Sequence, residues 1–111
     1  MDRLEKMRSA IESLLTELSR GTYLNLDIET ELVFDRDRDR YLLVNLGWQE
    51  DLRIYDSVLH LEIRDDRIWI QRNQTDVRIA DALKELGIEG DRIVVGVVPP
   101  SYRALAENSA S

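Results

Sequence analysis

The chain has 111 residues, no cysteine, and 15 basic against 22 acidic side chains, which give a net charge of −7. This length is ordinary for one domain, and the lack of cysteine excludes disulfides and cysteine-ligated zinc. The basic residues are scattered along an acidic chain. The clustered positive charge that duplex DNA binding needs is therefore missing, and direct nucleic-acid binding is not expected.

Two features of the sequence concern its cellular compartment. Charged side chains interrupt residues 1–5, so we expect no signal peptide. The longest apolar run, residues 93–100, is far too short to span a bilayer. With the absence of cysteine, these features predict a cytoplasmic protein without membrane contact. We expect one domain over residues 1–111, with a frayed tail at residues 107–111.

The first segment predicts an amphipathic helix. Its apolar residues recur at helical spacing and form one stripe: Leu4, Met7, Ile11, Leu14, Leu15 and Leu18. Asp2 is placed to cap the start of this helix, with Glu5 three residues later as in a capping box. Gly21 suits the left-handed conformation that ends many helices.

The hydrophobic pattern then changes to the alternation of β strands. Four strands are predicted, over residues 26–34, 41–48, 52–64 and 67–72. Polar turns connect them at residues 35–40, 49–51 and 65–66. Consecutive hairpins of this kind predict an antiparallel meander of about four strands.

A second helix and a short strand are predicted after the meander. Thr75 is a candidate cap for a helix over residues 76–86, which Gly87 ends. Residues 91–98 are rich in Val and Ile and predict a short final strand, which Pro99 stops. The predicted fold class is therefore α+β, with an N-terminal helix, the meander, the second helix and the final strand.

Turn lengths predict which residues share a sheet face. A two-residue turn at residues 65–66 gives these pairs: Ile63 with Ile68 and Leu61 with Ile70 on the core face, and Glu62 with Trp69 and His60 with Gln71 on the other. A three-residue loop at residues 49–51 adds to the second face Leu42, Val44, Leu46, Trp48, Ile54 and Val58. Two short helices are not expected to cover both faces, and an uncovered apolar face marks a binding surface.

Two patterns raise the possibility of a chemical site. Asp35, Asp37 and Asp39 have the spacing that opens a calcium loop, but Arg40 stands where glycine is needed. A solvated turn is the better interpretation, and the sequence implies no metal and no cofactor. His60, the only histidine, could act as a base beside Asp56 or Glu62. Without a second histidine, a cysteine or a glycine-rich loop, a structural histidine that meets Gln71 is the preferred interpretation.

A longer set of motifs carries a family resemblance. The joint run of Gly47-Trp48, His60 and Ile68-Trp69-Ile70-Gln71 resembles the XisI family, whose members are small cyanobacterial proteins named as controlling factors for excision of a DNA element. The resemblance extends over nearly the whole chain. Asp65-Asp66 departs from it, because the family usually has glycine in this turn, and so does the stretch after Arg103.

The resemblance implies a non-catalytic accessory factor in programmed DNA rearrangement by site-specific recombination. It also implies a companion, the XisH type of protein, which resembles a restriction-nuclease fold. We expect the chain to regulate such a partner and to form a homo-oligomer. The alternatives are a direct DNA-binding recombination factor and a small enzyme that uses His60. The candidate partner contacts, from the family motifs and the predicted open face, are Trp48, Arg53, Ile54, Val58, His60, Trp69, Gln71, Thr75, Asp76 and Arg103.

Overall fold

The first helix, α1 (Arg3–Ser19), begins where the sequence predicts it. The computed structural model describes residues 2–20 and 27–102. The Asp2 carboxylate accepts a hydrogen bond from the Glu5 backbone N–H at 2.7 Å, which satisfies one of the amides left unpaired at a helix start. Gly21, the predicted end of this helix, lies outside the described residues.

The predicted meander is confirmed, and it forms most of one five-stranded sheet. The strands are β1 (Ile28–Asp35), β2 (Arg40–Gln49), β3 (Leu52–Arg64), β4 (Arg67–Asn73) and β5 (Ile93–Val95). They lie side by side in this order, with β1 to β4 antiparallel and β5 parallel to β4. The last strand is shorter than the predicted 91–98. Short 3-10 turns flank it, η1 (Gly90–Arg92) and η2 (Pro100–Tyr102).

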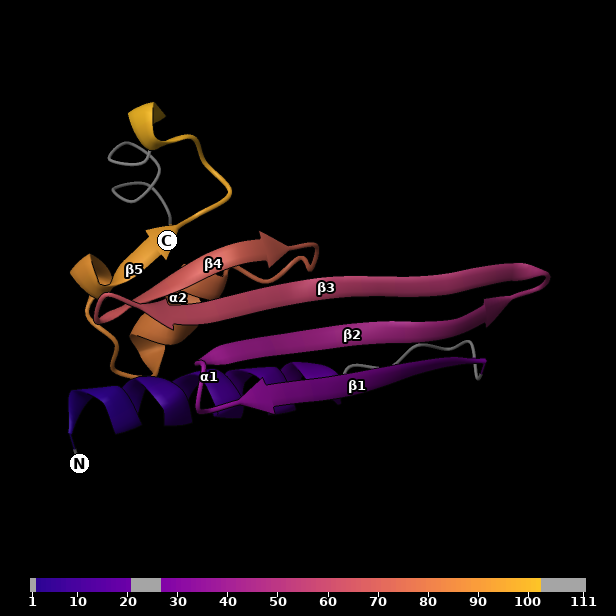
Figure 1. The fold of residues 1–111 in the computed structure, drawn as a ribbon, viewed down its shortest axis with the longest axis horizontal. Coiled ribbons are helices and arrows are strands. Elements are labelled where there is room, and N and C mark those ends of the chain that lie inside the picture. The colour runs from indigo at the N-terminus through magenta and orange to yellow at the C-terminus, as the bar shows by residue number, and fades with distance from the viewer. Residues whose placement is uncertain (1, 21–26, 103–111) are drawn as a thin grey trace.

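Both helices cover the same face of the sheet (Figure 1). The second, α2 (Ile79–Glu85), lies between β4 and β5 in the chain. A single core joins α1 and α2 to this face through Met7, Ile11, Leu15, Tyr41, Leu43, Leu59, Leu61, Ile63, Ile68, Ile70, Ile79 and Leu83. The opposite face therefore receives no helix from the described part of the chain. Among these residues no helix is long and apolar enough to cross a membrane.

The turn between β3 and β4 has two residues, as predicted. Asp65 and Asp66 both have left-handed backbones, with φ of 53° and 62°. This is the geometry of a hairpin turn in which glycine or asparagine is usual and aspartate is tolerated. The Asp66 carboxylate also forms ion pairs with Arg3 and, at 2.8 Å, with Arg92. These pairs connect the turn to α1 and η1. The β2–β3 loop, by contrast, has two residues rather than the predicted three, because Gln49 pairs with Leu52.

The predicted cap of the second helix is wrong. The helix begins at Ile79 rather than near residue 76, and its N-cap residue, Arg78, makes no side-chain capping bond. Thr75 instead organises the turn before it. The Thr75 hydroxyl accepts from the Val77 N–H at 3.1 Å and donates to the Asn73 side chain at 2.6 Å. Gly87, with φ of 93°, follows the helix end as predicted.

The turn at residues 35–40, interpreted from the sequence as a turn rather than a calcium loop, is held by ion pairs and hydrogen bonds. Asp39 accepts hydrogen bonds from Arg8 Nε at 2.8 Å and from the Tyr41 hydroxyl at 3.0 Å, and Asp35 pairs with Arg38. No cluster of three histidine, cysteine, aspartate or glutamate side chains suited to a metal occurs within residues 2–20 and 27–102. Burial of Tyr41, reinforced by its bond to the Asp39 carboxylate, raises the pKa of the phenol well above its usual 10.0.

This raised pKa predicts a loss of stability in alkali. The neutral phenol contributes fully below pH of about 10, and that contribution falls as the pH rises toward the folded-state pKa. Tyr41→Phe should cost about 1 kcal/mol at neutral pH and should flatten the decline above pH of about 10. Urea unfolding at neutral and alkaline pH measures both effects, with the exposed Tyr55→Phe as control. An unchanged pH slope in Tyr41→Phe would contradict the assignment.

Candidate interaction face on the open side of the sheet

The sheet face opposite the helices is here called the open face. Strand alternation and the observed pairing place on it Glu29, Glu31, Val33, Asp35, Arg40, Leu42, Val44, Leu46, Trp48, Arg53, Tyr55, Ser57, His60, Glu62, Arg64, Arg67, Trp69, Gln71 and Arg72. Its middle is an apolar column on β2, and charged and aromatic residues surround that column. The face is thus a broad surface of mixed chemistry.

A buried carboxylate lies at one end of the open face. The Glu62 side chain is only 7% exposed, and Arg64 Nη2 donates to it at 2.8 Å. His60 Nε2 lies 3.0 Å from the same carboxylate, Arg40 Nε 3.3 Å and Gln71 Nε2 3.4 Å. A buried charge is tolerated only when paired and hydrogen bonded in this way. Glu62 therefore holds in place the side chains that form this end of the open face.

An arginine side chain lies over the ring of each tryptophan on the open face. The Arg64 guanidinium lies 5.3 Å from the Trp69 ring centroid, and the indole N–H donates to the Arg64 carbonyl at 3.1 Å. At the other end of the face, Arg53 lies 5.3 Å from the Trp48 ring. Trp48 and the nearby Tyr55 are exposed by 49% and 69%. Large exposed aromatic rings of this kind are typical of interface residues.

The structure brings together five of the predicted contact residues. Trp48, Arg53, His60, Trp69 and Gln71 share the open face. The direct pairing of His60 with Gln71 is wrong, because a register shift makes Gln71 the extra residue of β4 and sets His60 opposite Arg72. Both side chains reach Glu62 instead.

Other predicted contacts lie elsewhere. Ile54 stands opposite Gly47, and so belongs to the helix side. Val58 is the extra residue of a β3 bulge and packs against the core, and the same bulge moves Asp56 to the helix side. Thr75 and Asp76 form the turn after β4, and Arg103 lies outside the described residues.

The centre of the cluster, Glu62, was predicted only as a neighbour of His60 and not as a partner contact, and Arg40 and Arg64 were not predicted as site residues. A signal for it exists in the sequence. His60, Glu62 and Arg64 occupy alternate positions on one strand, so their side chains point to the same face. Alternation does not reveal that Arg40, from the neighbouring strand β2, is a further partner of Glu62.

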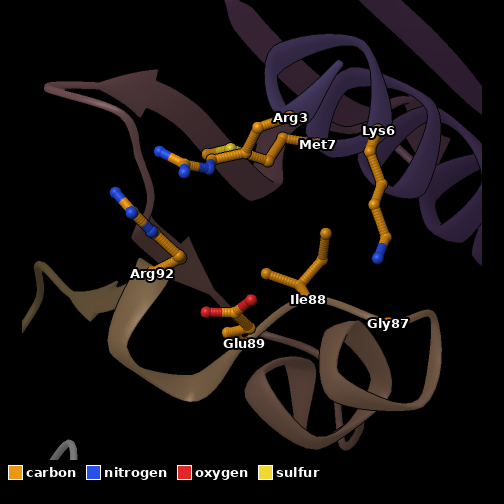
Figure 2. A pocket seen from close by; sticks show the side chains of 7 residues that line it. All are labelled: Arg3, Lys6, Met7, Gly87, Ile88, Glu89 and Arg92. Atoms are coloured by element: carbon orange, nitrogen blue, oxygen red, sulfur yellow. The ribbon is translucent and has the colours of Figure 1, made fainter. Parts of the chain in front are cut away.

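A small cavity of about 40 Å³ lies on the helix side, between α1 and the segment after α2 (Figure 2). Met7 and Ile88 form its apolar wall, and the Glu89 carboxylate points into it. Arg3, Lys6 and Arg92 stand around it. The sheet separates this cavity from His60, so it cannot supply a substrate pocket for that histidine.

Known proteins agree with the fold and the motifs. The family described as XisI protein matches residues 1–110. The chain belongs to the XisI family. Two crystal structures from Anabaena variabilis ATCC 29413 resemble this XisI-family chain. A XisI-like protein is 35% identical, with a TM-score of 0.88 over 94% of this chain and 95% of that one. The protein described as fdxN element excision controlling factor XisI is 30% identical, with a TM-score of 0.83 over 96% of each chain.

The comparison confirms the family and the α+β fold that the sequence predicts for this XisI-family chain. A search of curated proteins gives no match. Both crystal structures cover nearly the full described fold, so the open face belongs to a scaffold shared with them.

His60→Ala tests the role of the histidine. We expect it to lower the free energy of unfolding by about 1–2 kcal/mol, because Glu62 loses one of its partners while staying buried. His60→Gln, which keeps a donor, should recover part of the loss. Urea unfolding measures both variants. Equal stability of all three proteins, together with loss of a hydrolytic activity in His60→Ala, would mean that the histidine is catalytic.

Proposed function

We propose that this XisI-family protein is a non-catalytic accessory factor that controls excision of a DNA element and that it acts by binding other proteins. The observation that carries the proposal is the open face, which receives no helix from the described residues. It presents Trp48, which is 49% exposed, together with the partly exposed Leu42, Leu46 and Trp69, while both helices cover the other side. The solved relative described as an element excision controlling factor supports the cellular role.

The proposed partner is an XisH-type protein with a nuclease fold. Its support is the family resemblance and the net charge of −7. An acidic protein complements the basic groove of a DNA-cleaving enzyme, which steers the encounter and favours a salt-sensitive complex. Exposed acidic residues outside the open face, such as Glu50 and Asp51 in the β2–β3 turn and Asp91 in η1, are suited to that contact.

The surroundings of His60 favour a role without catalysis. Its Nε2 is engaged with Glu62, and the charge of that carboxylate is offset by Arg40 and Arg64. A general base also needs a substrate held in a pocket within hydrogen-bond reach of its other ring nitrogen, here Nδ1. His60 lies on an open sheet, with the described cavity on the far side.

Direct DNA binding is the second candidate, and one observation favours it. Arginines that are scattered in the sequence gather on the open face, namely Arg40, Arg53, Arg64, Arg67 and Arg72. Two of them offset Glu62, however, and Glu29 and Glu31 lie on the same face. These carboxylates would repel phosphates, so protein binding is the better-supported function.

We expect the isolated protein to show no sub-micromolar binding to duplex DNA at near-physiological salt. Fluorescence anisotropy measures this binding. An added XisH-type partner should co-purify with the chain, and the partner should bind DNA more weakly when the chain is present. The mixture should separate as salt is raised, because the contact is electrostatic. Tight DNA binding by the isolated chain would instead favour the second candidate.

A further inference from the structure

Two like-charge pairs of opposite sign lie on the open face. Glu29 and Glu31 alternate along β1, opposite Leu46 and Val44 of β2. Arg64 and Arg67 stand directly opposite each other on β3 and β4, and all four side chains are exposed. Like charges directly opposite each other, as in the arginine pair, destabilise a sheet, and of the two arginines Arg64 already pairs with Glu62. Within the described residues, Glu29, Glu31 and Arg67 have no side-chain hydrogen bond or ion pair.

We propose that the open face packs against the open face of a second copy of this chain, so that the glutamate pair of each copy meets the arginine pair of the other. In a two-fold dimer every contact occurs twice with the roles exchanged. A face that carries both signs in separate places is therefore complementary to itself. The inference rests on the proposed protein-binding role and names the occupant of the open face.

The sheet geometry allows this exchange. Strand spacing and rise place the two pairs about 25 Å apart, with Leu42 and His60 midway between them. A two-fold axis that lies in the interface, passes through this midpoint and runs perpendicular to the line joining the pairs exchanges them. On a flat sheet, the same axis sets Trp69 of each copy over β2 of the other, between the partly exposed Leu42 and Leu46. The charged contacts then flank an apolar centre, as in stable protein interfaces.

The size of the face is suited to a dimer. Five strands about 4.8 Å apart and about eight residues long give a footprint of roughly 600 Å². Stable complexes bury roughly 800 Å² on each partner, a value that projecting side chains such as Trp48 and Tyr55 bring within reach. The face is thus large enough for a reversible dimer.

A second copy fits the face better than a nucleic acid does. Base stacking needs open ring faces, but Arg53 and Arg64 lie 5.3 Å from the ring centroids of Trp48 and Trp69. Phosphates would pair with the arginines and leave Glu29 and Glu31 repelled. A second copy compensates both signs of charge at once.

A charge exchange between two variants tests the dimer. One variant is Glu29→Arg/Glu31→Arg, and the other is Arg64→Gln/Arg67→Glu, with glutamine at position 64 to avoid a like charge beside Glu62. Sedimentation velocity should show that the wild type dimerises and that each variant alone dimerises at least about tenfold more weakly. An equimolar mixture should recover dimers within about threefold of the wild-type affinity, because each variant then meets its opposite charge.

The matched control is Glu17→Arg/Glu85→Arg, which changes the net charge as much as the first variant but lies on exposed positions of α1 and α2. It should dimerise like the wild type, and circular dichroism should show all variants folded. A wild type that stays monomeric at about 100 μM overturns the inference, as does a mixture that fails to recover dimers. A monomeric wild type whose open face binds a single-stranded oligonucleotide, with the binding lost in Arg64→Gln/Arg67→Glu, overturns it in favour of nucleic acid.

Partner capture separates this inference from the proposed function. Each protein is also mixed with the XisH-type partner in a pull-down. If the mixed charge variants dimerise but no protein binds the XisH-type partner, the inference is supported and the proposed function is overturned. A monomeric chain that binds the partner does the reverse.

Discussion

Gly47→Ala should lower the free energy of unfolding by about 3 kcal/mol, because the added methyl group has no room. A Cβ at this position would lie 1.9 Å from the carbonyl oxygen of Asp27 and 2.8 Å from the Cα of Ile28. Both atoms belong to the backbone, so no side chain can rotate away. The start of β1 would have to lift from β2 and lose the bond from the Trp48 N–H to the Asp27 carbonyl.

Urea unfolding measures this cost, and Gly90→Ala is its control. At Gly90 the nearest atom to an added Cβ is Cε of Lys84 at 3.2 Å, near the end of a flexible side chain. That variant should stay within about 1 kcal/mol of the wild type. The pair of variants thus separates a backbone clash from a general effect of alanine. Equal stability of Gly47→Ala and the wild type would refute the close approach of β1 to β2.

Trp69→Ser should leave the chain folded and weaken its association about 30-fold, which corresponds to about 2 kcal/mol. Trp69 is half-buried on the open face, beneath the Arg64 guanidinium and next to the Glu62 cluster. We expect its ring to become fully buried when the chain associates. The serine variant removes that buried area without reaching the core, which lies on the other side of the sheet.

Size-exclusion chromatography with light scattering, together with a pull-down, measures the loss. Tyr102→Ser is the control, since Tyr102 is 62% exposed in η2, outside the sheet. It should associate like the wild type. If Trp69→Ser unfolds, or if it assembles normally, the open face is not the interface.

The sequence by itself determined the local elements of this protein. The stripe from Leu4 to Leu18 and the Asp2 cap specify α1, because both signals act within a few residues. The two-residue turn at residues 65–66 likewise fixes the pairing of Ile63 with Ile68 and of Glu62 with Trp69. The family motifs lie within these same segments, so the fold and the family were both predictable.

Only the tertiary structure decided which residues meet on the open face. Bulges at Val58 and Gln71 each add one residue to a strand, and a shift of one residue moves a side chain to the other face. Where a bulge forms depends on packing between strands, which no local pattern records. The bulges account for the corrected placements of Val58 and Asp56 and for the pairing of His60. The gathering of Arg40, His60 and Arg64 around Glu62 has the same origin, because it joins side chains from separate strands around one charge that burial forces to be paired.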